Sequence, residues 1–139
     1  MTGVLLDTNV VSELTRPTPA PPVLAFLRVQ DDLWMSTVVL HELEFGLLLL
    51  PPGRRRDALR DVLSEFMQRY EDRILSVDRT AAAWAARFRA DARRQGRPLD
   101  LGDALIAGTA KAGDLSVATR NVTDFRGLDL VVTNPWDFG

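Results

Sequence analysis

Cysteine is absent from this 139-residue chain, which excludes disulfides, thiolate zinc sites and cysteine nucleophiles. Histidine occurs once, at His41, so multi-histidine metal sites are excluded and a catalytic triad could draw on one imidazole at most. No apolar run reaches the ~18 residues of a membrane span, and the opening MTGVLLD turns acidic too early for a signal peptide. We therefore expect a protein of the reducing cytoplasm that has no membrane partner.

Lysine is nearly absent as well, because all but Lys111 of the 17 Lys and Arg residues are Arg. The net charge of −2 argues against a simple basic surface for nucleic acid. Arginines nevertheless cluster within residues 54–60 and again within residues 87–97. Guanidinium groups suit bidentate contacts with phosphate, yet such clusters are equally typical of solvated helix faces. Both interpretations stay open.

Short apolar runs without polar alternation predict strands that are buried on both faces. They occur at residues 4–6, 33–36, 74–77, 116–119 and 129–132. Helical periodicity with Pro or Gly at its ends predicts helices over residues 10–14, 23–30, 37–50, 54–72, 78–95 and 101–112. This alternation predicts an α/β fold class, a single domain spanning 1–139 whose central parallel sheet of about five strands has helices on both faces.

Three acidic residues stand where a carboxylate is unusual. Asp7 follows the first predicted strand, where ligands of parallel sheets bind, although it is also a typical N-cap for the next helix. Glu42 lies along an apolar line of its helix and would need a cationic partner there, but periodicity does not favour it over Glu44. Asp103 stands on a helix rich in Ala, Leu and Gly, with a capping arrangement around Asp100 as its simpler interpretation.

Asn121 and Asp124 follow the predicted strand 116–119, and a helix cap at Asn121 is the simple interpretation there. A parallel sheet would bring all these sites together, and several carboxylates in one cleft repel unless a divalent cation neutralises them. Oxygen ligands without a set of Cys or His indicate Mg²⁺ or Mn²⁺. Such an ion lowers the pKa of bound water and stabilises charge on phosphoryl oxygens, which points to hydrolysis of phosphodiesters.

The chain also resembles a known family, in motifs that occur in order along nearly its whole length. Residues 5–13, LLDTNVVSE, look like the opening of PIN-domain ribonucleases of the VapC toxin type, especially their FitB-like branch. Residues 36–46, with Ser36 and Glu42, are similar to the family's second motif, residues 103–107 to its third and residues 118–125 to its fourth. Residues 134–136, Asn-Pro-Trp, resemble the end of the FitB branch.

The resemblance implies a metal-dependent endoribonuclease, the toxin of a toxin–antitoxin pair, that hydrolyses RNA phosphodiester bonds through metal-activated water. It further implies a cognate antitoxin that silences the toxin, and a homodimer or a larger toxin–antitoxin assembly. Asp7, Glu42 and Asp103 would be the catalytic acids around Mg²⁺ or Mn²⁺. Thr8 and Thr119 would support them with their hydroxyl groups.

One position departs from this pattern. The family often has a fourth acid where this chain has Asn121. Asp124 lies three residues further on, and whether it takes over that role is left open by the sequence, as is the number of metal ions. This departure keeps a second interpretation alive, in which the chain is a catalytically inactive PIN-like module that binds RNA or an antitoxin.

Two other classes are weaker. An Asp after the first strand also suits aspartyl-phosphate chemistry of the haloacid-dehalogenase type. Those enzymes usually carry a second Asp two residues on, where this chain has Asn9, and Lys111 would have to act as the cationic partner. A DNA-binding regulator would need a basic recognition helix and net positive charge, and the sequence has neither.

Overall fold

The computed structural model describes residues 3–139 and contains one sheet of five parallel strands in the order β3-β2-β1-β4-β5. The strands are β1 (Val4–Leu6), β2 (Leu33–Ser36), β3 (Ile74–Leu75), β4 (Ser116–Ala118) and β5 (Val132–Thr133). The central strand β1 is buried throughout, with Leu5 and Leu6 fully inaccessible. Burial on both faces explains why its sequence shows no polar alternation, and the predicted α/β class is confirmed.

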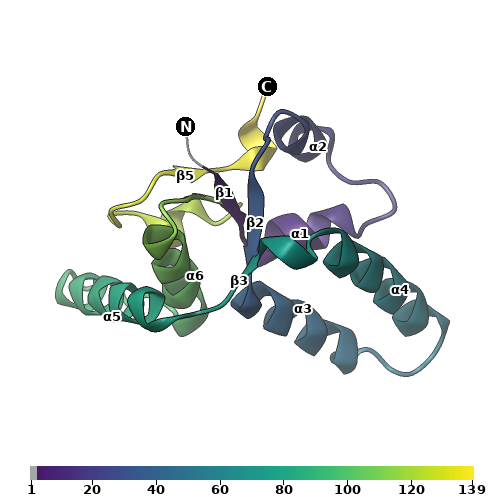
Figure 1. The fold of residues 1–139 in the computed structure, drawn as a ribbon, viewed down its shortest axis with the longest axis horizontal. Coiled ribbons are helices and arrows are strands. Elements are labelled where there is room, and N and C mark those ends of the chain that lie inside the picture. Colours follow the sequence, from purple (N-terminus) through teal and green to yellow (C-terminus); the bar gives the residue numbers. More distant parts are fainter. Residues whose placement is uncertain (1–2) are drawn as a thin grey trace.

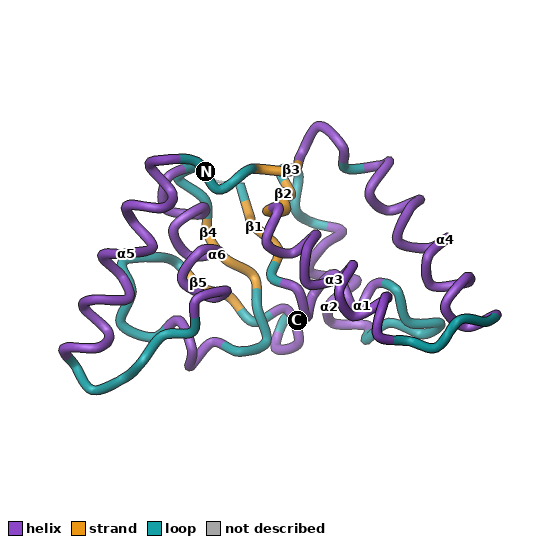
Figure 2. Tube along the Cα trace, turned by 90° about the horizontal axis from the view of Figure 1, so that it is seen from below, coloured by secondary structure: helices purple, strands orange, loops and turns teal. Residues whose placement is uncertain are grey.

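Six α-helices of the described chain flank this sheet (Figure 1). They are α1 (Thr8–Leu14), α2 (Pro21–Arg28), α3 (Thr37–Leu49), α4 (Arg54–Arg69), α5 (Arg79–Arg94) and α6 (Leu101–Ala112). Figures 1 and 2 both show α5 and α6 on one side of the strands, with α1, α3 and α4 on the other. Within residues 3–139, none of these helices has the length and apolar character needed to cross a membrane.

Four helices begin where a side chain accepts a backbone N–H of the first turn. Asp7, Ser36, Asp78 and Asp100 cap α1, α3, α5 and α6 in this way. Capping by Asp7 starts α1 at Thr8, two residues before the predicted start. The start of α2 at Pro21 is also two residues early, because proline at the first helical position has no N–H to leave unpaired.

Other predicted boundaries were wrong as well. The third strand ends at Leu75, two residues before the predicted end, and α4 ends at Arg69 before a short 3₁₀ turn, Glu71–Arg73. The fifth strand covers Val132–Thr133 and not residues 129–132. The physical reason is tertiary, because this strand is defined by its pairing with β4, in which Val132 lies beside Val117 and Thr133 beside Ala118. Edge strands of two residues carry too little sequence pattern to locate accurately.

Candidate functional site

Asp7 lies at the carboxyl end of β1, and three groups orient its side chain. Its Oδ1 accepts the backbone N–H of Thr8 at 2.8 Å, and its Oδ2 accepts the Thr119 hydroxyl at 2.7 Å and the Asn9 amide at 3.3 Å. The side chain is buried, as is that of Thr119. Asp7 is therefore both the helix cap and a residue of the cleft, so the two interpretations of the sequence do not exclude each other.

Burial is the main influence on the Asp7 carboxyl and raises its pKa above the ordinary value. The hydrogen bonds from Thr119, Thr8 and Asn9 act in the opposite direction, and the charge of Asp124 adds to the rise. The net shift is upward. The protein thus keeps an acid in a place where its ionised form is disfavoured unless positive charge arrives.

Glu42 reaches this cleft from α3. Its Oε1 accepts the Thr8 hydroxyl at 2.7 Å, and its Oε2 lies 4.0 Å from where a Cβ at Gly102 would stand, beside Asp103. Glu42 is exposed, so the apolar line on which it lies in the sequence does not bury its carboxylate. Phe45 on the same helix is exposed as well, so apolar neighbours in sequence do not indicate burial here.

Asp103 faces the same cleft from the first turn of α6 and is half-buried. The cap of that helix is Asp100, whose Oδ2 accepts the Gly102 N–H at 3.0 Å. Burial, followed by the charges of Asp7, Asp100, Asp124 and Glu42, raises the pKa of Asp103 to about 7. These mutual repulsions require the acids to lie near one another, although they are far apart in the sequence.

Asn121 and Asp124 take different places. Asn121 lines the cleft and donates its backbone N–H to the Thr119 hydroxyl at 3.0 Å. It stands at the N-cap position of the 3₁₀ turn Val122–Phe125, as expected, but its side chain makes no capping hydrogen bond there. Asp124 lies in the 3₁₀ turn Val122–Phe125 and is exposed. Its charge raises the pKa of both Asp7 and Asp103.

The cleft itself has a volume of about 500 Å³. Besides the acids, its walls include Arg16, Arg120 and Trp136, which the sequence did not single out for a role in the site. A partial signal existed for Trp136, which belongs to the Asn-Pro-Trp motif. Arg120 has a comparable signal, because it stands within the motif of residues 118–125, whereas Arg16 lies outside the quoted motifs and outside both arginine clusters.

The donor chemistry of this cleft suits a divalent cation. Carboxylates and hydroxyls are the ligands that Mg²⁺ and Mn²⁺ prefer, and positive charge would reverse the repulsion that raises the pKa of Asp103. Within residues 3–139, however, no three His, Asp or Glu side chains are drawn together as a ready-made ion site.

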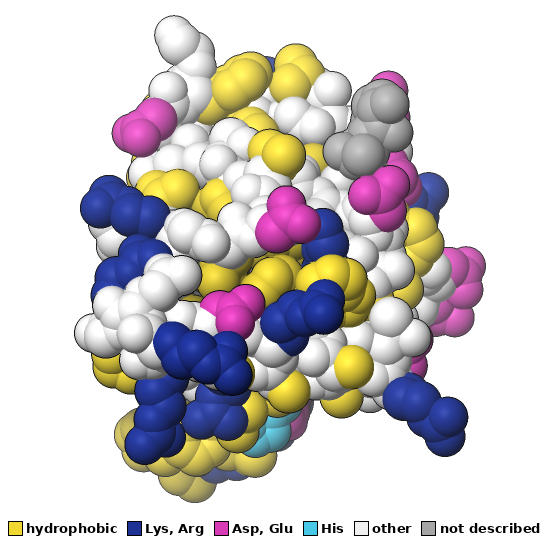
Figure 3. Space-filling view, turned by 90° about the vertical axis from the view of Figure 1, so that its left-hand side faces the viewer, with side chains coloured by type: hydrophobic (Ala, Val, Ile, Leu, Met, Phe, Trp, Pro, Cys, Tyr) yellow, Lys and Arg dark blue, Asp and Glu magenta, His cyan; other side chains and the backbone are white. Residues whose placement is uncertain are grey.

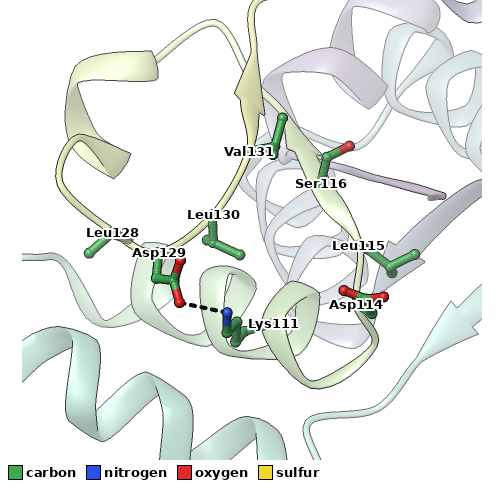
Figure 4. Close-up of a pocket in the computed structure, with 8 residues that line it drawn as sticks. All are labelled: Lys111, Asp114, Leu115, Ser116, Leu128, Asp129, Leu130 and Val131. Carbon is green, nitrogen blue, oxygen red and sulfur yellow. Dashed lines mark hydrogen bonds and ion pairs between the residues drawn. The ribbon is translucent and has the colours of Figure 1, made fainter. Parts of the chain in front are cut away.

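Lys111 lies at the other end of β4 and does not line this cleft (Figure 4). Its ammonium group contacts Asp129 Oδ2 at 2.8 Å in a separate hollow of about 330 Å³. Aspartyl-phosphate chemistry at Asp7 would require this lysine as its cationic partner, so the fold removes the partner that this class requires.

The two arginine clusters also lie away from the acids. Figure 3 shows Lys and Arg side chains gathered on the side of the molecule that carries α5 and α6. Residues 87–97 supply exposed arginines there, and Arg89 and Arg93 border a shallow hollow of about 660 Å³. The cluster of residues 54–60 is on α4. Neither cluster lines the candidate site.

Comparison with known proteins agrees with this geometry. The PIN domain family model matches residues 4–129. Toxin FitB of Neisseria gonorrhoeae is 38% identical over 136 residues, covering 96% of this chain and 98% of that protein. VapC ribonuclease Y4jK of Sinorhizobium fredii is 36% identical over 137 residues, covering 96% of this chain and 98% of that protein. The crystal structure of FitAcB from Neisseria gonorrhoeae has a TM-score of 0.90 at 37% identity, covering 97% and 99% of the two chains.

The chain therefore belongs to the PIN-domain family. Its relatives include ribonucleases of the VapC type and toxins of toxin–antitoxin systems, and PIN-domain nucleases generally use a divalent metal ion.

Proposed function

We propose that this protein is a metal-dependent endoribonuclease and the toxin of a toxin–antitoxin pair. The observation that carries the proposal is the convergence of Asp7, Glu42 and Asp103 on one cleft at the carboxyl end of the central strand. The membership of the PIN-domain family and the likeness to a VapC ribonuclease support the same conclusion. Because the substrate would be cellular RNA, we place the protein in the cytoplasm.

Asp7, Glu42 and Asp103 would hold Mg²⁺ or Mn²⁺. The ion would supply two things, neutralisation of the carboxylates and activation of water toward a phosphodiester. Thr119 acts as a positioning residue, because its hydroxyl and the Asn9 amide both donate to Asp7 Oδ2 and fix the carboxylate plane. Thr8 does the same for Glu42 through its hydroxyl.

Asp124 is proposed as a source of additional negative charge for the site. It stands close enough to raise the pKa of both Asp7 and Asp103. Asn121, at the position where relatives of this type often have an acid, would contribute through its backbone N–H to Thr119. Asp124 thus compensates in charge for Asn121 without lining the cleft.

The protein is further proposed to act with partners. A toxin of this type is silenced by a cognate antitoxin, which would bind the folded domain. Self-association is suggested by apolar side chains on the outer face of α3, where Phe45 is 57%, Leu48 51% and Leu49 69% exposed. A homodimer through this face would remove them from water, and toxin–antitoxin pairs could join into larger assemblies.

The second candidate is a PIN-like module that binds RNA or an antitoxin without cutting. One observation favours it: Asn121 stands where relatives of this type often have an acid. It predicts little or no affinity for Mg²⁺ or Mn²⁺, whereas the nuclease predicts binding that depends on Asp7.

The test is cleavage of total RNA by protein freed of antitoxin, in Mg²⁺, in Mn²⁺ and in EDTA. Asp7→Asn is the inactivating variant, with an expected loss of about 100-fold or more. Asp114→Asn is the matched control, because Asp114 lies at the opposite end of β4 with φ 54°, a conformation that Asn adopts readily.

Discrete fragments that require metal, persist in Asp114→Asn and vanish in Asp7→Asn would support the nuclease, and mapping their ends would identify the substrate. A folded wild-type protein that cuts nothing across a broad set of RNAs would favour the binding module. Cleavage that survives in Asp7→Asn would show either contamination or a different active site.

A further inference from the structure

The wall of the cleft contains two cations beside its acids. Among residues 3–139, Arg16 and Arg120 are the Lys or Arg residues that line it. The carboxylates of Asp7, Glu42 and Asp103 would repel the phosphate backbone of an approaching RNA strand. A substrate phosphate therefore needs compensating positive charge nearby. The two guanidinium groups are the groups in place to supply it.

Arg120 is held at both ends. Its backbone N–H donates to Asn9 Oδ1 at 3.1 Å, which ties it to the residue that orients Asp7. Its guanidinium Cζ lies 4.8 Å from the centre of the Trp136 ring. The residue is exposed, and its side chain forms no ion pair or hydrogen bond with the described residues. The N–H edges of the guanidinium therefore remain available to a ligand.

Trp136 is a firm support for this arginine. Its backbone N–H donates to Asn134 Oδ1 at 2.9 Å, and the neighbouring Pro135 is buried. Two residues on, Phe138 packs edge-to-face against Phe26 of α2 with ring centres 5.5 Å apart. These contacts hold the last turn of the chain against α2, and the Trp136 side chain is partly buried against the hydrophobic core.

Arg16 is fixed from the other wall through Glu13. The Glu13 carboxylate is 5% exposed and accepts the Ala20 N–H at 2.7 Å and Arg16 Nη1 at 3.2 Å. These contacts bridge the proline-rich segment 16–22, whose backbone has few conformations to lose. The Arg16 side chain is still 64% exposed, so the donors that Glu13 does not use face solvent.

We propose that Arg16 and Arg120 together form a phosphate-binding site for single-stranded RNA, with Trp136 as the support that orients Arg120. The proposal rests on the proposed function, and it assigns the grip on the RNA backbone to these residues and not to the arginine clusters of α4 and α5. Guanidinium edges suit the bidentate contacts that phosphate oxygens accept. Such contacts position the strand without reading its sequence.

The chain provides a matched control for this site. Arg87 on α5 lies 4.9 Å from the ring centre of Trp84, nearly the same arrangement as Arg120 over Trp136, but it is outside the cleft. Arg120→Gln and Arg87→Gln therefore remove the same charge from the same kind of support. Arg16→Gln tests the second member of the site, and Arg120→Lys retains the charge but loses the planar fork.

The experiment measures binding of a fluorescently labelled single-stranded oligoribonucleotide of randomised sequence, in EDTA to prevent cleavage, at several salt concentrations. We expect Arg120→Gln and Arg16→Gln each to weaken binding about tenfold and to reduce the slope of log K against log salt by about 1. Arg87→Gln should bind like the wild type. Arg120→Lys should keep the salt slope of the wild type and recover only part of the affinity. Because this variant retains the charge, its partial recovery would show that the loss in Arg120→Gln is not caused by misfolding.

Three results would overturn the inference. Equal affinity in wild type and Arg120→Gln would exclude the site, and equal losses in Arg120→Gln and Arg87→Gln would show a general charge effect. Displacement of RNA by an oligoglutamate peptide as readily as by unlabelled RNA would show a carboxylate site. If metal-dependent cleavage persists in any of these cases, the proposed function stands and only this inference fails. A wild-type protein that neither binds nor cuts RNA would exclude both the proposed function and this inference.

Discussion

The Thr119 hydroxyl donates to the Asp7 carboxylate at 2.7 Å, although the two residues stand 112 positions apart in the chain. The pairing follows from the sheet, because β1 and β4 are neighbouring parallel strands and both residues come directly after them. Thr119 is fully buried, so its hydroxyl is a donor that water cannot replace.

Removing this hydroxyl tests the positioning role of Thr119. We expect Thr119→Val to lower kcat/KM for RNA about 10–100-fold, because Asp7 loses the donor that orients it, and Thr119→Ser to stay near wild type. The control is Thr109→Val, since Thr109 is equally buried but donates to the Leu105 carbonyl at 2.7 Å within α6. A Thr109→Val enzyme that loses as much activity as Thr119→Val would contradict the assignment.

The raised pKa of Asp103 leads to a prediction of how the stability of the metal-free protein depends on pH. Its pKa rises from 3.8 to about 7 in the folded state, so between these values the folded protein binds a proton that the unfolded chain has released. The free energy of unfolding therefore falls as the pH rises through this window. We expect Asp103→Asn to melt about 2–5 °C above the wild type at pH 8 and the difference to shrink at pH 5.

Thermal unfolding followed by circular dichroism in EDTA measures this effect. Asp114→Asn, at an exposed position away from the cleft, should show no such change between the two pH values. The melting temperature of Asp103→Asn should still fall somewhat between pH 5 and pH 8, because the pKa of Asp7 is raised as well. The interpretation fails if Asp103→Asn and the wild type melt together at pH 8.

The packing of α5 on α6 depends on Gly108. A Cβ at that position would lie 2.3 Å from the Ala81 carbonyl oxygen and 2.8 Å from the Ala85 nitrogen, and neither backbone atom can move without shifting α5. We expect Gly108→Ala to lower the free energy of unfolding by about 2–3 kcal/mol.

Gly46→Ala provides the opposite case, since a Cβ there meets nothing within 4 Å in the middle of α3. It should stabilise the monomer by about 0.5–1 kcal/mol through helix propensity. Urea unfolding of both variants, at concentrations low enough for the monomer, measures the two effects. The close contact is unimportant if Gly108→Ala proves as stable as the wild type.

Self-association through the α3 face predicts the behaviour of a further pair of variants. Leu49 on α3 and Val131 before β5 are both 69% exposed, but only Leu49 has exposed Phe45 and Leu48 on the same helix. We expect Leu49→Glu to shift a dimer to monomer and Val131→Glu to leave it unchanged. Sedimentation velocity over a concentration series measures this. A wild type that is monomeric throughout, or a dimer unaffected by Leu49→Glu, would exclude the α3 face.

Much of the fold could be predicted from the sequence, and the reason is local. β1, β2 and α6 have the predicted boundaries, because buried strands read as uninterrupted apolar runs and α6 lies between an Asp cap and a Gly. The two-residue strand β5 was misplaced, since its position is set by its pairing with β4, in which Val132 lies beside Val117 and Thr133 beside Ala118. Local pattern contains no information about such a contact.

The candidate site, too, could be predicted from the sequence only in part. The sequence by itself determined which acids exist and that Asp7 follows a buried strand, because alternation of strands and helices places such residues at one edge of a sheet. Only the tertiary structure decided that Glu42 is exposed, that Lys111 lies at the far end of β4, and that Arg16 and Arg120 share the cleft. These relations are set by packing between segments that are distant in the sequence. Periodicity within one segment indicates only which face of that segment is apolar, and not which other segment packs against it.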